Sequence, residues 1–388
     1  MLIERNEQAP MSEEYPLMAF IANEGVAPKG ERYDRSSLVT DTENKLYKKT
    51  ECGDFIYSSN NLETGSIGLN KYGKACISPV YSIFQPTGIA DSNFLGRRLV
   101  RKDFINSMVK WRQGVIYGQW RIHESDFLKI EIPVPSVEEQ KQIGTFLNSL
   151  DNLITLHQRK YDKLTNVKKS MLEKMFPQNG SNAPEIRFKG FTEAWEQRKL
   201  SEIATMHARI GWQNLRTSEF LDSGDYMLIT GTDFIDGAVN FDTCHYVERE
   251  RYEQDKHIQI RNGSILITKD GTLGKVAYIQ GLTMPATLNA GVFNVEIKDE
   301  NEVDNRYLFQ YLKAPFLMDY VDKKATGGTI KHLNQNILVD FPVVLPHKAE
   351  QEKIGEYFLA IDHLITLHQR ELEKLKNLKK ACLEKMFV

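Results

Sequence analysis

Two stretches of the chain carry apolar residues at alternating steps of four and three, which is the pattern of a coiled-coil helix. The first seam comprises Ile143, Leu147, Leu150, Ile154, Tyr161, Leu164 and Met171, and the second comprises Ile354, Phe358, Ile361, Ile365, Leu372, Leu375 and Cys382. Such spacing places apolar side chains along one face of a helix. Pro135 and Pro346 precede the two stretches and Pro177 follows the first, as expected for residues that bound helices. The pattern predicts long helices over residues 137–176 and 348–388.

The two predicted helices are copies of one another. Residues 140–176 and 351–387 align without a gap at an offset of 211 (351 − 140), and 21 of the 37 aligned positions are identical. One polar residue interrupts each seam at its centre, His157 and His368. This could be a catalytic or metal-binding histidine, but a residue that fixes the helix register is favoured. If the helices pair antiparallel about a pseudo-twofold axis, the two histidines meet near that axis.

This internal repeat makes each half of the chain a domain followed by a long helix. We expect a first domain over residues 1–136, a helix over 137–176, a linker over 177–190, a second domain over 191–347 and a helix over 348–388. The linker region is rich in Gly, Asn, Ser and Pro, which is typical of connecting segments. Basic residues on the helix flanks, such as Lys168 and Lys169, are expected to face solvent.

Short apolar runs bounded by glycine predict β-strands in both halves. The first half contains CGDFIYSS and TGSIGLNKYGKACI, and the second contains NGSILITKDGTLGKVAYI. We interpret each as a Gly-led strand, a Gly-Ser/Thr-Ile/Leu-Gly turn and a Lys-containing strand. The turn Gly271–Gly274 resembles a phosphate-binding loop, but it lacks the GxxxxGKS/T spacing and a following helix, which favours a β-hairpin. Both domains are therefore expected to be mixed α+β.

Composition narrows the class of protein. The chain has 50 Lys+Arg and 52 Asp+Glu, a formal net charge of −2, which argues against a polybasic nucleic-acid binder. No apolar window is long enough for a membrane helix, and the first thirty residues do not follow the pattern of a signal peptide. The four cysteines are far apart and form no CxxC pair. This argues against a zinc ribbon or a disulfide framework and favours the cytoplasm.

Positive charge is concentrated ahead of each long helix. Residues 97–121 contain seven Lys/Arg and one Asp, a net +6, and residues 306–332 contain five Lys/Arg and two Asp, a net +3. A solvated basic face would explain either cluster alone, but two clusters at matching positions favour contacts with DNA phosphates and bases. The candidate DNA-binding residues are Lys71, Lys74, Arg112, Gln113, Tyr117, Gln119, Arg121, Lys269, Lys275, Lys324, Thr326, Lys331 and His332.

The motifs of several common enzyme classes are missing. The sequence has no P-loop, no GxGxxG, no Asn/Asp-Pro-Pro-Tyr/Phe motif of DNA methyltransferases, no HExxH or GxSxG, and no metal-spaced His/Cys cluster. We therefore expect a chain without catalytic residues or a bound metal. Two alternatives are an enzyme with an unrecognised site and a coiled-coil scaffold without a nucleic-acid role.

The chain resembles the specificity subunits of type I restriction–modification systems over nearly its whole length. The matching segments are the helix entries VPSVEEQKQIG and LPHKAEQEKIG, the two LITLHQR and LEKMF stretches, the FKGFTEAWEQRKLSEIA opening of the second half, ILITKDGTLGKVAYI and TGGTIKHLN. One departure is that the first half starts at MLIERNEQAPMSEEYPL, so we expect the first domain to lack the opening segment of the second.

The resemblance implies two mixed α/β target recognition domains, joined by two long antiparallel coiled-coil helices with pseudo-twofold symmetry. Each domain would read one half of a bipartite double-stranded DNA target. The helices would set the spacing and dock two methyltransferase subunits, with restriction subunits completing the complex. Helix pairing would use Ile143, Leu147, Leu150, Ile154, His157, Ile354, Phe358, Ile361, Ile365 and His368.

The same resemblance implies that this subunit is non-catalytic. S-adenosylmethionine, ATP and Mg would be bound by the partner subunits and not by this chain. An alternative within this class is the specificity subunit of a type II enzyme with fused cleavage and methylation.

Overall fold

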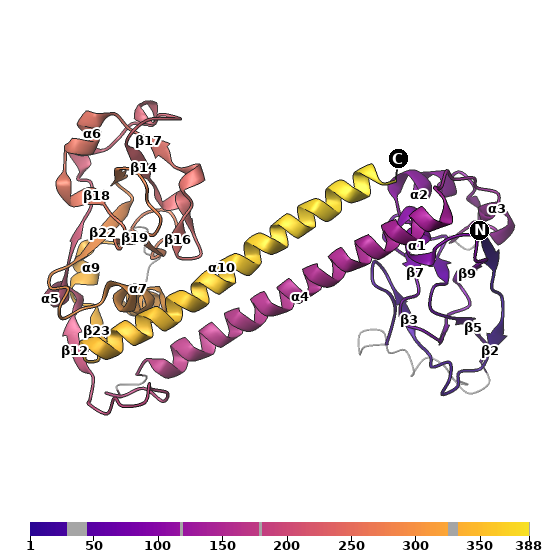
Figure 1. The fold of residues 1–388 in the computed structure, drawn as a ribbon, viewed down its shortest axis with the longest axis horizontal. Coiled ribbons are helices and arrows are strands. Elements are labelled where there is room, and N and C mark those ends of the chain that lie inside the picture. Colours follow the sequence, from indigo (N-terminus) through magenta and orange to yellow (C-terminus); the bar gives the residue numbers. More distant parts are fainter. Residues whose placement is uncertain (29–44, 117–118, 178–180, 325–332, 388) are drawn as a thin grey trace. The chain divides into compact units, whose positions relative to one another are not determined.

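The computed structural model describes residues 1–28, 45–116, 119–177, 181–324 and 333–387 (Figure 1). These residues form two compact units: unit 1 is Met1–Gln158 with Glu371–Val388, and unit 2 is Arg159–Arg370. The boundaries pass through the two long helices, α4 (Val137–Met175) and α10 (Lys348–Lys385). Each unit therefore contains one mixed α+β domain and one half of each helix. Among the described residues, every helix lacks the apolar run that a bilayer crossing requires.

Unit 1 contains a four-stranded antiparallel sheet of order β1-β9-β6-β7 and a three-stranded sheet of order β2-β5-β8, with the pairs β3-β4 and β10-β11 beside them. Its elements before α4 are β1 (Leu2–Glu4), β2 (Gln8–Ala9), β3 (Ala19–Ile21), β4 (Gly25–Ala27), β5 (Tyr47–Thr50), β6 (Phe55–Tyr57), β7 (Ile67–Leu69), β8 (Ala75–Ile77), β9 (Ser82–Pro86), α1 (Ser92–Arg98), α2 (Lys102–Val109), β10 (Gln113–Ile116), β11 (Gln119–Arg121) and α3 (Glu124–Phe127).

Unit 2 contains the sheets β13-β22-β19-β20 and β17-β14-β21-β18, with the pairs β12-β23 and β15-β16. Its elements between the long helices are β12 (Glu196–Lys199), α5 (Leu200–Ile203), β13 (Ala204–His207), η3 (Gly211–Gln213), η4 (Thr217–Glu219), β14 (Met227–Ile229), η5 (Gly231–Asp233), β15 (Phe234–Ile235), β16 (Ala238–Val239), η6 (Phe241–Thr243), β17 (His245–Tyr246), α6 (Arg249–Glu253), η7 (Lys256–Ile258), β18 (Gln259–Ile260), β19 (Ile265–Thr268), β20 (Val276–Tyr278), β21 (Ala286–Leu288), β22 (Val292–Ile297), α7 (Asn305–Lys313), α8 (Phe316–Lys324), α9 (Gln335–Val339) and β23 (Pro342–Leu345).

One sheet is built twice. The order and antiparallel pairing of β1-β9-β6-β7 recur in β13-β22-β19-β20. Leu2 is the counterpart of Ala204, because they pair with Pro86 and Ile297 at the ends of β9 and β22. In unit 2 the segment before β13 adds β12, which pairs with β23, whereas residues 130–135 of unit 1 form no strand.

The glycine-rich segments differ from the prediction in one respect. Strands β19 and β20 pair as an antiparallel hairpin around Gly271–Gly274, which confirms the hairpin. In unit 1, however, Leu69 pairs with Phe55, just as Tyr278 pairs with Ile265. The GSIG segment therefore runs into strand β7 instead of forming the turn. The predicted equivalence of the two Gly/Lys segments was wrong, because the loop between β6 and β7 is longer than the loop between β19 and β20.

The long helices pack antiparallel within each unit (Figure 1). In unit 1 the start of α4, with buried Ile143, Leu147 and Leu150, shares a core with Phe387 just beyond the end of α10. In unit 2 Met175 and Phe176 at the end of α4 share a core with Ile354 and Phe358 near the start of α10. Burial of this apolar seam is the main stabilising contribution at each junction.

The central seam residues are less deeply buried. Ile361 is buried, whereas Ile154, His157, Ile365 and His368 are half-buried. His157 belongs to unit 1 and His368 to unit 2. Their meeting at a pseudo-twofold axis stays a prediction.

A glutamine and a glycine join each domain to the start of its own long helix. The side chain of Gln140 accepts from the Asp91 backbone N–H at 3.0 Å and donates to the Pro135 carbonyl at 2.9 Å. Gln351 repeats this with Asp304 at 3.0 Å and Pro346 at 2.8 Å. A Cβ on Gly144 would lie 2.6 Å from the Asp91 carboxylate, and one on Gly355 would lie 2.9 Å from that of Asp304. The shared EQxxIG pattern therefore encodes this close approach.

A carboxylate on one helix and a lysine on the other form a second repeated junction. Asp151 pairs with Lys379 at 2.6 Å in unit 1, and Asp362 pairs with Lys168 at 2.6 Å in unit 2. These pairs are equivalent, because the offset of 211 relates both the acids and the lysines. Lys168 is only 7% exposed. The prediction of a solvated face was therefore wrong for Lys168, since the amino group lies against the other helix.

The buried amino group of Lys168 gives stability a specific pH dependence. Burial, with repulsion from Lys313, lowers the pKa of Lys168 to about 8, although Asp362 opposes this shift. Between that value and the ordinary lysine value, the unfolded chain binds a proton that the folded chain does not. The free energy of unfolding should therefore rise with pH through this window, by up to about 3 kcal/mol. Lys168→Met should remove this rise in urea unfolding experiments between pH 7.5 and 10.

Lys379→Met is the matched control, because Lys379 is the equivalent residue and its side chain is 32% exposed. Its pH dependence should follow that of the wild type. Equal slopes for Lys168→Met and the wild type would contradict this account of the junction.

Candidate nucleic-acid interface

The basic residues ahead of α4 do not form one exposed face. On α1, Arg97 donates to Asn148 at 2.7 Å and to Asp151 at 2.6 Å, both on α4. Arg98 pairs with Asp103 at 2.8 Å, and Arg101 donates to the Leu383 carbonyl of α10. Arg97 and Arg101 therefore hold the domain against the long helices, whereas Arg98 is engaged within the domain. The net +6 of the sequence window therefore overstates the charge that is open to a ligand.

In the second basic cluster, residues 306–332, the first basic side chains are also paired with acidic groups. Arg306 pairs with Asp304 at 2.9 Å and with Glu356 of α10 at 2.8 Å. Lys313 lies 3.6 Å from Asp362 and donates to the Asp236 carbonyl at 2.6 Å. In both units the helix after the repeated sheet uses its cations as anchors. The open basic side chains of the candidate set lie outside these two helices.

Arg112 is a structural residue in the free chain. Its guanidinium makes two parallel 2.7 Å hydrogen bonds to Glu63 and a third, at 3.1 Å, to the Ser59 carbonyl. The bidentate pair lowers the pKa of Glu63 and is the stronger geometry for an arginine–carboxylate contact. Only 12% of the Arg112 side chain is exposed. Arg112 therefore ties the β6–β7 loop to the segment that leads into β10.

The hairpin β10-β11 carries a basic side chain that is more exposed than that of Arg112. Arg121 is 65% exposed and lies 3.9 Å from Glu124. Trp120, the preceding residue, is also exposed, and its backbone N–H donates to Asn60. Gln113 donates to Asp126 at 3.1 Å. Gln119 begins β11, and Tyr117 lies outside the described residues.

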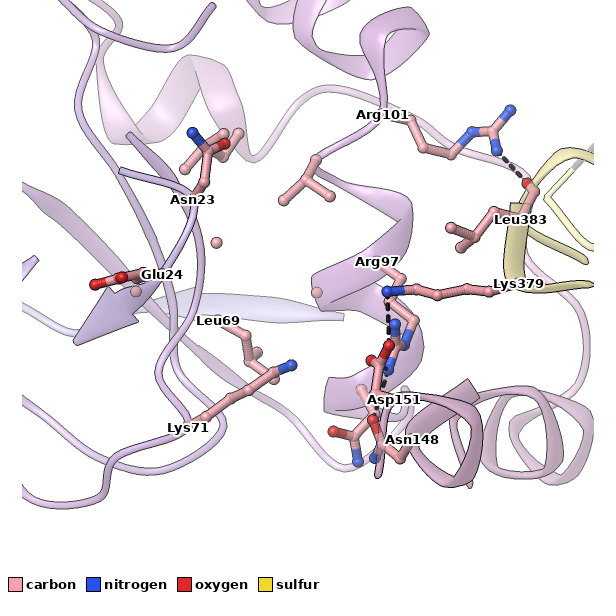
Figure 2. Close-up of a pocket in the computed structure, with 16 residues that line it drawn as sticks. Asn23, Glu24, Leu69, Lys71, Arg97, Arg101, Asn148, Asp151, Lys379 and Leu383 are labelled. Carbon is pink, nitrogen blue, oxygen red and sulfur yellow. Dashed lines mark hydrogen bonds and ion pairs between the residues drawn. The ribbon is translucent and has the colours of Figure 1, made fainter. Parts of the chain in front are cut away.

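Lys71 lines a cavity of about 380 Å³ inside unit 1 (Figure 2). Asp151 lies between Arg97 and Lys379, and Arg101, which also lines the cavity, points toward the Leu383 carbonyl of α10. Burial and repulsion from Arg97 and Lys379 lower the pKa of Lys71. The cavity therefore carries more cationic than anionic groups. Lys74, in contrast, is on the surface and pairs with Glu14, which raises its pKa.

Unit 2 fills the corresponding place with aromatic rings. Tyr278 and Phe309 pack there with ring centroids 5.3 Å apart, where unit 1 has Leu69 against Gly96. Gln310 replaces Arg97 and donates to Asp362 at 2.8 Å. The two domains therefore share a scaffold but differ in the shape and charge of this region.

In unit 2 two of the predicted residues, Lys269 and Lys275, lie in the β19–β20 hairpin. Lys275 is exposed, and Lys269 lies 5.3 Å above the Phe293 ring. The Lys269 carbonyl accepts from the Leu333 N–H at 2.8 Å, so the chain at residue 333 lies against this hairpin. Lys324 is exposed beside Tyr320. Thr326, Lys331 and His332 lie outside the described residues.

The DNA-binding residues predicted from the sequence therefore include both solvent-exposed side chains and side chains that are already paired within the chain. Arg121, Lys275 and Lys324 are open to solvent, whereas Arg112 and Gln113 are held by acidic partners. The selection missed the junction residues Arg97 and Lys379. The offset of 211 that relates Asp151–Lys379 to Asp362–Lys168 was a signal for Lys379. It gave none for Arg97, because Gln310 stands at the equivalent position of unit 2.

Comparison with known proteins identifies the family. The model of the type I restriction modification DNA specificity domain matches residues 16–166 and 192–377. The chain is 25% identical over 336 residues to the type I restriction enzyme MjaVIII specificity subunit of Methanocaldococcus jannaschii, covering 84% of this chain and 76% of that protein. It is 26% identical over 267 residues to the putative type I restriction enzyme MjaX specificity subunit of that organism, covering 68% of this chain and 60% of that protein.

A solved structure supports the fold. The S subunit of a type I restriction–modification system from M. genitalium matches with a TM-score of 0.56 at 16% identity, covering 100% of this chain and 96% of that one. This likeness confirms the architecture of two mixed α+β domains with paired long helices. Since the family model covers most of the chain in two consecutive stretches, the chain belongs to the type I restriction–modification DNA specificity subunits, which are the non-catalytic, sequence-selecting parts of these systems.

Proposed function

We propose that this chain reads a bipartite DNA target, with one recognition domain for each half-site, and that its long helices fix the distance between them. The observation that carries this proposal is the repetition of the whole junction between domain and helices. Gln140 and Gln351, and the pairs Asp151–Lys379 and Asp362–Lys168, hold two similar domains in the same way. Two equivalent binding modules on a rigid connection suit two half-sites at a fixed separation.

Open basic and aromatic side chains support DNA contact in each domain. Arg121 with Trp120 in unit 1, and Lys275 in unit 2, lie on hairpins and are exposed. Lysine and arginine neutralise phosphates, and arginine can also read guanine in the major groove. The cationic cavity of unit 1 and the packed Tyr278 and Phe309 rings at the corresponding place of unit 2 support two domains that read different half-sites.

Exposed leucines on the helices support docking of two methyltransferase subunits. Leu153 and Leu156 on α4 are 42% and 46% exposed, and Leu364 and Leu367 on α10 are 42% and 44% exposed. The two pairs are related by the offset of 211 and belong to the unchanged LITLHQR segment. Large apolar side chains left open at equivalent sites are typical of protein interfaces. Two equivalent patches fit two copies of one partner.

The methyltransferase and restriction subunits would catalyse DNA methylation and cleavage, and the complex would act in the cytoplasm. S-adenosylmethionine would bind the methyltransferase subunits, and ATP and Mg the restriction subunits. A type II enzyme with fused cleavage and methylation is the alternative partner. The genes next to this one would distinguish the two.

The first test separates the two readers. Arg121→Ala should weaken methylation only at one half-site, and Lys275→Ala only at the other, because each removes a cation from one domain. A lost base contact costs about 1–3 kcal/mol. Arg112→Ala should instead lower the thermal stability of the chain, since it leaves Glu63 unpaired. Methylome sequencing of cells that also express the methyltransferase subunit measures the effects at both half-sites. Equal loss at both half-sites from Arg121→Ala would contradict the model.

The second test changes the spacer. Duplicating the heptad of residues 151–157 in α4 and that of residues 362–368 in α10 preserves the seam and adds seven residues to each helix. This lengthens the pair by roughly 10 Å, equivalent to about three base pairs. Methylome mapping should show an unaltered pair of half-sites separated by about three more base pairs. A seven-residue insertion in the linker 177–190 is the control and should leave the spacing unchanged. An unaltered spacing in the helix variant would show that the helices do not set it.

The third test addresses docking. The variant in which Leu153 and Leu156 are both replaced by Asp should co-purify with one methyltransferase subunit instead of two. The variant with the same change at Leu364 and Leu367 should lose the other subunit. The physical reason is the cost of burying a charge at an apolar contact. The stoichiometry can be measured by native mass spectrometry. Glu138→Lys, an exposed change on α4 away from the leucines, is the control. A complex with two methyltransferase subunits in both double variants would contradict this docking surface.

A further inference from the structure

We infer that His207, His257 and Glu296 in unit 2 form a binding site for a divalent transition-metal ion of the zinc type. One ligand atom from each side chain lies within 4.8 Å of those from the other two. The Nε2 atom of His207 is 3.8 Å from a carboxylate oxygen of Glu296, and the two imidazole rings stack with centroids 4.5 Å apart. The inference is independent of DNA reading and docking.

Three elements bring these side chains together. His207 ends β13, Glu296 lies on β22, and His257 lies in η7. In the β13–β22 register Glu296 pairs with Thr205, two residues before His207. Residues two apart on a strand share a face, so His207 and Glu296 lie diagonally on one side of the sheet. This cluster cannot be recognised from a short sequence motif, because its members are 50 and 39 residues apart (257 − 207 and 296 − 257).

Neighbouring groups hold the backbone of His257. Its N–H donates to the Asp255 carboxylate at 2.9 Å, and its carbonyl accepts from Asn294 at 3.0 Å. Asn294 is itself on β22, where it pairs with His207. The turn that carries His257 is therefore fastened to the strand beside the other two ligands. Such supporting contacts orient metal ligands in proteins.

The donor set selects the class of metal. Two imidazole nitrogens and one carboxylate suit zinc, cobalt, nickel or copper, whereas Mg and Ca prefer sites made only of oxygen. Tetrahedral zinc with bonds of about 2.0–2.2 Å places its ligand atoms about 3.4 Å apart. The His207–Glu296 separation is already near this value, and side-chain rotation closes the remaining distances. The three side chains are half-buried or exposed, so water can complete the coordination.

A bound ion would cross-link the edge of the second domain. Strand β13 is at the end of its sheet, and its ion-mediated links to β22 and η7 would hold that edge. Since the ion would bind the folded chain through three separate elements, binding would stabilise the fold.

The experiment uses the full chain after removal of metals with EDTA. Zn²⁺ is titrated at pH 7.5 against a chromophoric chelator, with and without excess Mg²⁺. The expected result is one Zn²⁺ per chain that Mg²⁺ does not displace, together with a higher thermal midpoint. His257→Ala should weaken Zn²⁺ binding roughly tenfold or more, and Glu296→Gln should also weaken it. Co²⁺ should give a visible spectrum without a thiolate charge-transfer band.

Two controls make the outcome decisive. His363→Ala, an exposed histidine on α10, should bind Zn²⁺ as the wild type does. A circular dichroism spectrum shows whether His257→Ala is folded, and Glu296→Gln supplies a second, milder test. The inference is overturned if the wild type binds no Zn²⁺ at micromolar concentrations. It is also overturned if both site variants bind as the wild type does, or if a thiolate band shows that cysteines hold the ion.

Discussion

Antiparallel packing of two repeated helices is the constraint on which the rest of this structure depends. Because α4 and α10 run in opposite directions within each unit, every unit contains the start of one helix and the end of the other. Each domain therefore contacts both helices. Burial of the seam residues provides the bulk of the stabilisation, while Asp151–Lys379 and Asp362–Lys168 join the two helices by an ion pair in each unit. The desolvation cost of burying Lys168 offsets much of its attraction to Asp362, so this pair adds less to stability than the apolar seam does.

The duplicated junction leaves the domains free to diverge. Gln140, Gly144 and their counterparts keep the approach of helix to domain the same in both units. Beyond the junction, Leu69 and Gly96 border a cationic cavity in unit 1, where Tyr278 and Phe309 fill the space in unit 2. A common scaffold with different side chains above it is consistent with the proposed reading of two different half-sites.

The sequence was informative where the signal is periodic and uninformative where it depends on distant partners. The four-three spacing and the gapless repeat predicted the long helices, and the glycine-bounded apolar runs predicted that both domains are mixed α+β. The linear charge count could not show that Arg97 pairs with Asp151 or that Lys168 pairs with Asp362, 194 residues away (362 − 168). Similarly, the GSIG and GTLG segments have similar sequences. Because the β6–β7 loop is longer than the β19–β20 loop, GSIG runs into strand β7 whereas GTLG forms the turn. The cluster of His207, His257 and Glu296 is assembled only by strand register.

The central proposal is that the two domains read the two halves of the DNA target as a pseudo-twofold pair, so that their relation sets the symmetry of the target. A chain in which residues 204–346 are replaced by residues 2–135 would carry the first recognition domain at both positions, since Leu2 is the counterpart of Ala204. Methylome sequencing of cells that express this chain with the methyltransferase subunit is the most direct measurement. The account predicts a target made of the first half-site and its inverted repeat. A direct repeat, or an unchanged asymmetric target, would contradict it.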